Sequence, residues 1–198
     1  MREENKTIRQ DQIESAAYKV LEQKGYAGTS MQSIAKQARA SNETLYKWYG
    51  DKLGLYKALV TRNAAEIKSL LEAELSADRD PLAILGLLGP KLLTLLLGDR
   101  AIALNRAAAA DRSGVLGVTL SQAGRESVLP LLVRVMEAAH QKGQLSFEDT
   151  EAAVGLYLDL LIGDLQIRRV IGRQAAPDQD FCTARAERAT GLLQKILS

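Results

Sequence analysis

Helix start and stop signals recur along the whole chain, and no stretch alternates apolar and polar residues as a half-buried strand would. Leu, Ala, Lys, Glu, Gln and Arg dominate, and these residues favour helices. We expect the Thr7 hydroxyl to cap the N-terminus of the first helix. The sequence therefore predicts an all-α fold of about nine helices, over residues 7–25, 30–38, 41–49, 51–75, 81–97, 98–113, 121–142, 150–172 and 181–197, with a kink or break expected at Pro90 and a kink at Pro130.

Composition removes several classes of function. The chain has 26 basic and 24 acidic side chains, a net charge of +2, one cysteine (Cys182) and one histidine (His140). These counts exclude an intrachain disulfide, a CxxC motif and a metal site built from several histidines. The N-terminus lacks an apolar leader, and the longest apolar run, residues 84–97, is interrupted and shorter than the ~18 residues that cross a bilayer. We expect a cytoplasmic protein with no metal, no cofactor and no membrane partner.

Two short predicted helices, residues 30–38 and 41–49, are separated only by Arg39 and Ala40. This is the length and spacing of a helix-turn-helix unit, whose second helix enters the major groove of DNA. The second helix is mostly polar, and only Leu45 and Tyr49 are spaced to anchor it in a core. Residues 1–62 carry 11 Lys and Arg against 7 Asp and Glu, so this part of the chain is modestly basic. The pattern indicates double-stranded DNA as a partner.

The polar residues of this unit have the chemistry to contact a duplex. Asn42 can pair with adenine, Glu43 can accept a hydrogen bond from cytosine, and the Thr44 methyl can meet a thymine methyl, so we assign these three to base edges. The surrounding hydroxyl, indole and cationic groups are of the kinds that bind phosphate: Thr29, Ser30, Arg39, Ser41, Tyr46, Lys47, Trp48 and Lys52. The alternative interpretation is a short surface helix in an all-α domain.

Three runs around this unit, at residues 29–35, 38–49 and 51–56, read TSMQSIA, ARASNETLYKWY and DKLGLY. Together they resemble the DNA-binding head of the TetR family of transcriptional regulators, and residues 124–172 are similar to the C-terminal domain of its AefR-like branch. The resemblance implies phosphate contacts for Tyr46, Trp48 and Lys52. The family usually has glycine where this chain has Arg39. If the backbone there needs a positive φ, arginine costs on the order of 1 kcal/mol, which a new contact to phosphate could offset.

The helix predicted over residues 150–172 has apolar residues on two sides, which indicates that it is buried on two sides. One side can face its own domain and the other a second copy of the chain. Together with the last helix it would form a four-helix dimer interface, as the resemblance also implies, through Leu156, Leu160, Ile167, Ala189, Leu192, Leu193 and Ile196. The alternative is a monomer in which the last helix covers the one before it.

Polar residues in or beside the apolar runs are candidates for a ligand pocket: Asn105, Arg106, Tyr157 and Asp159. We expect residues 1–51 to form the helix-turn-helix domain and residues 52–198 a ligand-binding and dimerisation domain, with the helix from Asp51 linking the two. The expected function is a ligand-responsive transcriptional regulator, a repressor rather than an activator, that binds a near-palindromic operator as a homodimer and is released by an unidentified small molecule. With one histidine, one cysteine and no phosphate-binding loop, an enzyme is not expected. The alternatives are a helical protein–protein adaptor, or a small-molecule carrier or enzyme with a degenerate head.

Overall fold

The computed structural model describes residues 2–198, with side chains from residue 5 onward, and this part of the chain contains helices and no strand. The all-α prediction is confirmed. The helices are α1 (Arg2–Lys24), α2 (Met31–Ala38), α3 (Asn42–Tyr49), α4 (Lys52–Ser76), α5 (Pro81–Leu97), α6 (Asp99–Ala110), α7 (Val115–Leu120), the π-helical turn η1 (Ser121–Arg125), α8 (Glu126–Gln141), α9 (Thr150–Ile162), α10 (Leu165–Val170) and α11 (Gln179–Ile196).

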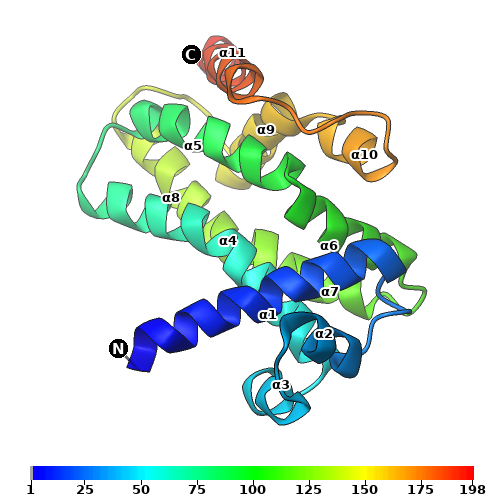
Figure 1. The fold of residues 1–198 in the computed structure, drawn as a ribbon. Helices are drawn as coiled ribbons and strands as arrows, with labels where there is room; N and C mark the ends of the chain where they lie inside the picture. Colours follow the sequence, from blue (N-terminus) through cyan, green and yellow to red (C-terminus); the bar gives the residue numbers. More distant parts are fainter. Residues whose placement is uncertain (1) are drawn as a thin grey trace.

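The helices form a small head and a larger body (Figure 1). In the head, α1 lies across α2 and α3, and their apolar sides pack around Ile13, Ile34 and Leu45. Neither α2 nor α3 is long enough to be stable alone, so this shared core holds them. Side chains cap the starts of three helices, because Ser30, Ser41 and Asp51 each accept a hydrogen bond from a backbone N–H of the first turn.

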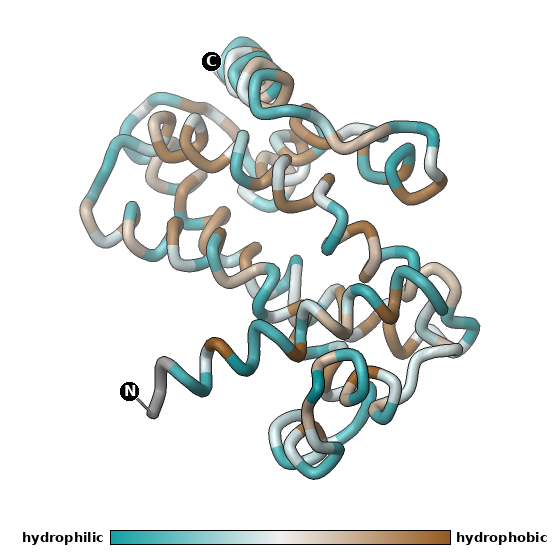
Figure 2. Tube along the Cα trace, in the orientation of Figure 1, coloured by the Kyte–Doolittle hydropathy of each residue, from teal (hydrophilic) through white to brown (hydrophobic). Residues whose placement is uncertain are grey.

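The body encloses a second core around Leu71, Leu88 and Val135. In Figure 2 the apolar stretches of the body lie mainly toward its interior, as expected for packed amphipathic helices. Helix α11 packs closely against α5, where Gly89 leaves room: a Cβ atom on Gly89 would lie 2.6 Å from the Cβ of Ala186. This contact fixes the last helix on its own protomer.

Helix α4 belongs to both parts. Its first half, including Leu55 and Leu59, packs in the head core, whereas Ile67 and Leu71 pack in the body core. The Tyr56 hydroxyl donates a 2.9 Å hydrogen bond to the Leu104 carbonyl of α6, so the body also touches the head through α6. Motion of the body relative to the head is therefore constrained by two neighbouring helices.

Several predicted helix boundaries were wrong. Thr7 lies inside α1 and does not cap it, because the helix begins at Arg2. Pro90 lies inside α5 and does not break it, whereas the kinks expected at Pro90 and at Pro130, which lies inside α8, stay predictions. The helix expected over residues 150–172 is divided at Gly163, which has φ +51°, into α9 and α10.

Among the described residues, no single helix combines the length and the apolar character needed to span a bilayer. Helices α5 and α6 reach that length and composition only as a pair bent by 56°.

Candidate nucleic-acid interface and internal cavity

Helix α3 buries one side chain completely and presents most of the others to solvent. Leu45 is fully buried, whereas Asn42 and Glu43 are exposed and Thr44 is half-buried. The Ser41 hydroxyl accepts a 3.1 Å hydrogen bond from the Thr44 N–H and lies 2.8 Å from the Thr44 hydroxyl. The three residues assigned to base edges therefore project from the first turn of a capped helix, with Thr44 oriented by Ser41.

The aromatic residues of α3 divide between surface and core. Tyr46 is 51% exposed, which is unusual for a tyrosine and leaves its hydroxyl available to a partner. Trp48 and Tyr49 are half-buried, pack against the head core and meet edge to face with ring centroids 6.5 Å apart. Lys47 is exposed. Tyr46 and Lys47 thus lie on the accessible side of α3.

The start of α2 is closed by a reciprocal cap. The Ser30 hydroxyl accepts from the Ser33 N–H and the Ser33 hydroxyl accepts from the Ser30 N–H, both at 3.1 Å. Ser30 is exposed, but Thr29 is 4% exposed and its hydroxyl donates a 2.7 Å hydrogen bond to the Gly25 carbonyl. The assignment of Thr29 to a phosphate contact is therefore wrong, because this hydroxyl holds the loop before α2.

Lys52 occupies a different environment from the one expected. Its Nζ donates to the Tyr26 carbonyl at 3.0 Å and to the Thr29 carbonyl at 3.1 Å, and lies 4.2 Å from the centroid of the Tyr26 ring. Two of its three ammonium donors are thus used to bind the α1–α2 loop to the start of α4. This geometry makes Lys52 a structural residue of the head.

The turn between α2 and α3 has a left-handed residue at Arg39, with φ 49° and ψ 43°, so the backbone there does need a positive φ. The Arg39 side chain is exposed. Sequence reasoning missed the residue that faces this turn: the Arg9 guanidinium of α1 donates to the Ala38 carbonyl at 3.3 Å and to the Arg39 carbonyl at 2.5 Å. No local pattern marks Arg9, since its acceptors lie about thirty residues away.

A buried carboxylate of α1 pairs with α4 close to Tyr49 of α3. Glu14 of α1 is 8% exposed and pairs with Arg62 of α4 at 3.3 Å, while Arg62 also bonds Asp11. Burial raises the pKa of Glu14 above its ordinary value, and the Arg62 charge offsets only part of that effect. Burial likewise raises the pKa of the nearby Tyr49 hydroxyl.

The body contains a cavity of about 460 Å³ between the end of the head and the helices of the body. Its wall is mainly aliphatic, from α4 to α10, and includes Val60, Ile67 and Leu132. Six polar side chains also line it: Asn63, Asn105, Ser121, Arg125, Asp159 and Gln166. Two of the four predicted pocket residues, Asn105 and Asp159, are therefore at the cavity.

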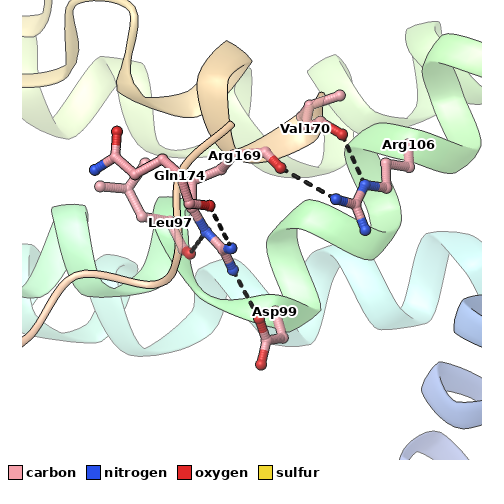
Figure 3. Close-up of polar contacts among 6 residues, drawn as sticks. All are labelled: Leu97, Asp99, Arg106, Arg169, Val170 and Gln174. Carbon is pink, nitrogen blue, oxygen red and sulfur yellow. Dashed lines mark hydrogen bonds and ion pairs between the residues drawn. The ribbon is translucent and has the colours of Figure 1, made fainter. Parts of the chain in front are cut away.

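The other two predicted pocket residues are used elsewhere. The Tyr157 hydroxyl is buried and donates a 3.2 Å hydrogen bond to the Leu85 carbonyl. Arg106 donates to the carbonyls of Val170 and Arg169 at 2.8 and 3.1 Å, as Figure 3 shows. Tyr157 lies outside the cavity, because its hydroxyl binds a carbonyl of a distant helix, whereas Arg106 lines a separate cavity of about 390 Å³ between α1 and α6.

Figure 3 also shows how α10 is fastened to the body. Arg169 is 8% exposed, and its guanidinium donates to the Leu97 carbonyl at 2.8 Å, to the Gln174 carbonyl at 3.1 Å and to the Asp99 carboxylate at 2.7 Å. The cluster joins α10 to the junction of α5 and α6. A buried charge is tolerated here because each of its three nitrogens donates a hydrogen bond to the protein, one of them to a carboxylate.

The residues predicted for a dimer interface do not share one surface. Ala189 and Leu193 are buried in the core of the protomer, so their assignment to a partner contact is wrong. They face inward because α11 packs on α5 and α9. Leu156, Leu160 and Leu192 are half-buried, and Ile167 and Ile196 are 56% and 55% exposed. Ile171, the C-cap of α10, and Phe181 of α11 are exposed as well.

Two family models match the chain. Residues 13–59 match the model described as bacterial regulatory proteins, tetR family, and residues 83–193 match that of the AefR-like transcriptional repressor C-terminal domain. No functionally curated protein matches the sequence at a significant level.

Solved structures share the fold over nearly the whole chain. A TetR transcriptional regulator from Agrobacterium tumefaciens is 29% identical, with 96% of this chain and 94% of that chain covered and a TM-score of 0.74. A protein described as a TetR-family transcriptional regulator from Mesorhizobium loti is 22% identical, with 96% of both chains covered and a TM-score of 0.75. The regulator FadR from Bacillus subtilis, solved with stearoyl-CoA, is 18% identical, with 94% and 98% covered and a TM-score of 0.72.

Proposed function

The chain belongs to the TetR family of bacterial transcriptional regulators, and from that premise we propose that it represses transcription by binding an operator as a homodimer and leaves DNA when a small molecule fills the body cavity. The observation that carries this proposal is the exposed polar side of α3, held on a capped and shared core, in a molecule that also has an apolar cavity where head and body meet. A polar surface helix or an apolar cavity alone also occurs in other classes of protein. A ligand-responsive regulator needs both in one molecule.

In this proposal the first turn of α3 reads base edges through Asn42, Glu43 and Thr44. Ser30, Ser41, Tyr46 and Lys47, which have exposed side chains, contact phosphates, as do the exposed Arg39 and the half-buried Trp48. One small head binds DNA weakly, and joining two makes the second contact intramolecular, which raises avidity by ~10²–10⁴-fold. The operator should then be near-palindromic, with half-sites about one helical turn, or a multiple of it, apart.

The exposed isoleucines of α10 and α11 supply a surface for the second copy. Replacing two of them, as Ile167→Glu with Ile196→Glu, should give a folded monomer that binds operator poorly, because both side chains are exposed in the protomer. Sedimentation and circular dichroism check the assembly and the fold. A double variant that remains a dimer would contradict this surface, and Ile8→Glu, at an exposed isoleucine of α1, is the control.

Helix α4 provides the path from cavity to DNA. Asn63, Ala64 and Ile67 line the cavity, while the start of the same helix holds the loop before α2 through Lys52. A ligand that favours a different tilt of α4 changes the separation of the two heads. Typical couplings of ~1–3 kcal/mol would weaken operator binding by about 5–150-fold.

The lining favours a small, mainly aliphatic effector with few polar groups. None of the described residues at the cavity is aromatic, and the one cation and one anion, Arg125 and Asp159, balance in charge. The B. subtilis FadR complex with stearoyl-CoA gives an example of the same fold holding a ligand with a long aliphatic chain. An aliphatic molecule gains affinity mainly by leaving water, so a cavity of this kind needs little polar recognition.

The proposal is tested by selecting genomic fragments with the purified protein at low salt and repeating the binding with Asn42→Ala and Tyr46→Ala. Asn42→Ala should relax preference at one base pair by about 1–3 kcal/mol, whereas Tyr46→Ala should weaken binding to all fragments alike. Glu187→Ala, exposed on α11, is the control. Failure of the wild-type protein to retain any duplex at low salt would overturn the function.

A further inference from the structure

The backbone of the α2–α3 turn adopts a conformation that an arginine disfavours. Arg39 lies in the left-handed region, where the Cβ atom of any residue other than glycine crowds the following carbonyl. The turn is closed on its inner side by the Ala40 N–H, which donates to the Ala35 carbonyl at 2.9 Å, and by the Arg39 N–H, which donates to the Lys36 carbonyl at 3.2 Å. The strain at Arg39 therefore persists only if something outside the turn stabilises it.

That support comes from α1. The Arg9 guanidinium donates to the carbonyls of Ala38, the last residue of α2, and of Arg39, its C-cap, neither of which accepts a hydrogen bond within the helix. A third contact, from Arg9 to the Gln12 side chain at 2.7 Å, fixes the guanidinium on its own helix. The positive charge also faces the negative end of the α2 dipole. One side chain thus neutralises and orients both carbonyls of a strained turn.

We infer that Arg9 is a positioning residue for DNA recognition: it holds the turn at Arg39, and through the turn it sets the direction in which α3 presents its first residues. This inference rests on the proposed function, since it concerns how α3 is aimed at DNA. Residues Ser41, Asn42 and Thr44 follow the turn directly, so a small rotation at Arg39 displaces all three. The Arg9 donors point at protein carbonyls and the side chain is half-buried, which distinguishes it from the exposed cations of the same surface.

A double-mutant cycle tests this assignment. Arg9→Ala is made in the wild-type background and together with Arg39→Gly, because glycine adopts the left-handed conformation without strain and no longer needs the support. In each comparison the proteins with Arg9 and with Arg9→Ala have the same residue at position 39. The effect of losing the Arg39 charge therefore cancels. Arg9→Ala should weaken binding to the fragment selected by the wild-type protein by about tenfold with Arg39, and by less than about threefold with Arg39→Gly.

Two further measurements separate positioning from a direct phosphate contact. The dependence of affinity on salt should be the same for Arg9→Ala as for the wild type, and hydrogen exchange at the amides of residues 39–45 should be faster in Arg9→Ala than in the variant that also carries Arg39→Gly. Lys19→Ala, an exposed cation of α1, is the control for lost charge and should change neither.

An equal loss of affinity in both backgrounds would overturn the inference, as would a salt dependence reduced by about one ion for Arg9→Ala, which indicates a phosphate contact. These outcomes leave DNA binding by the wild-type protein intact. If the wild-type protein binds no fragment at all, the proposed function itself fails, and the two failures are thereby distinguished.

Discussion

Lys52 illustrates how one residue can be given two different roles by sequence and by geometry. Its contacts to two loop carbonyls and to the Tyr26 ring make it a brace between α4 and the loop before α2. We predict that Lys52→Ala lowers the free energy of unfolding by about 1–2 kcal/mol, because charge-assisted hydrogen bonds in a half-buried site are lost. Thermal and denaturant unfolding measure this loss.

The matched variant for Lys52→Ala is Lys47→Ala, which removes an exposed cation from α3. Lys47→Ala should leave stability unchanged and reduce the slope of log affinity against log salt by about 1, whereas Lys52→Ala should leave that slope unchanged. A reduced slope for Lys52→Ala would mean that its ammonium leaves the loop to bind a phosphate.

Glu14 gives the head a pH dependence. Because burial raises the pKa of Glu14 in the folded protein above its value in the unfolded chain, the folded state binds a proton more readily than the unfolded state. At neutral pH Glu14 is ionised in both states, and its burial then lowers the free energy of unfolding. As the pH falls through the folded pKa toward the lower pKa of the unfolded chain, folded Glu14 binds a proton and the protein becomes more stable. Relative to Glu14→Gln, the wild type should gain stability as the pH falls over that window.

Denaturant unfolding from pH 7 down to pH 4.5, the ordinary pKa of a glutamate side chain, measures the difference in stability between the wild type and Glu14→Gln. Acid effects of Asp80 and Asp111, whose pKa values are lowered by hydrogen bonds, are common to both proteins and cancel. The exposed Glu22→Gln variant shows whether burial is responsible. A difference that is flat with pH, or that runs the opposite way, would show that the Arg62 charge outweighs burial.

Local side-chain roles could be predicted from the sequence, whereas distant ones could not. The caps at Ser30, Ser41 and Asp51 bond N–H groups three residues along the chain, so their spacing identifies them. Lys52, Arg106 and Tyr157 instead bind carbonyls between 23 and 72 residues away. Only the packing of whole helices decides which carbonyl a long side chain reaches.

At the scale of elements, the contact between α5 and α11 depends on a missing side chain. A Cβ atom on Gly89 would lie 2.6 Å from the Ala186 Cβ and 3.2 Å from the Tyr157 hydroxyl, closer than packed atoms allow. Gly89→Ala should therefore destabilise the protein by about 1–3 kcal/mol as the two helices separate. The control is Gly86→Ala on the exposed side of the same helix, where no atom lies within 4 Å and stability should stay the same or rise slightly. Equal effects from the two variants would contradict close packing at Gly89.

The helical type of the elements followed from periodicity, but their number and their breaks did not. Pro90 lacks an N–H for the Gly86 carbonyl, and since Gly86 is exposed, water can take that place and α5 continues. Gly163, by contrast, ends α9 although glycine inside a helical pattern is often tolerated. Its positive φ accompanies the Arg185 guanidinium nearby, a neighbour from α11 that no local pattern identifies.

At the scale of the whole molecule, the cavity lies where head and body meet. Its wall includes α4 and α6, which carry the Tyr56–Leu104 contact between the two parts, and the π-helical turn η1, whose Gly124 approaches Val60 of α4. Two separate elements at the cavity, α6 and η1, thus touch α4, the helix that enters the head. An occupant of this cavity acts on that helix directly, without a relay through intermediate residues.

Gly117 offers a way to fill the cavity from its own wall. It lines the cavity from α7, and a Cβ atom there would meet nothing within 4 Å, so Gly117→Leu adds a side chain to open space without displacing the backbone. The variant should fold at least as stably as the wild type and keep operator affinity. It should lose binding of an aliphatic probe such as decanol. In the wild type, affinity should rise roughly threefold to fourfold for each CH₂ added along the series of alcohols from hexanol to decanol.

The same experiment tests the coupling between cavity and operator. Decanol should weaken operator binding by the wild type, and operator should weaken decanol binding by an equal factor, because coupling between two sites is reciprocal. Gly117→Leu should show neither effect, whereas Gly86→Leu, a matched substitution at an exposed glycine of α5, should behave like the wild type. If both variants bind decanol alike, the probe lies outside the cavity. If the wild type binds decanol with no change in operator affinity, occupation of the cavity does not move α4.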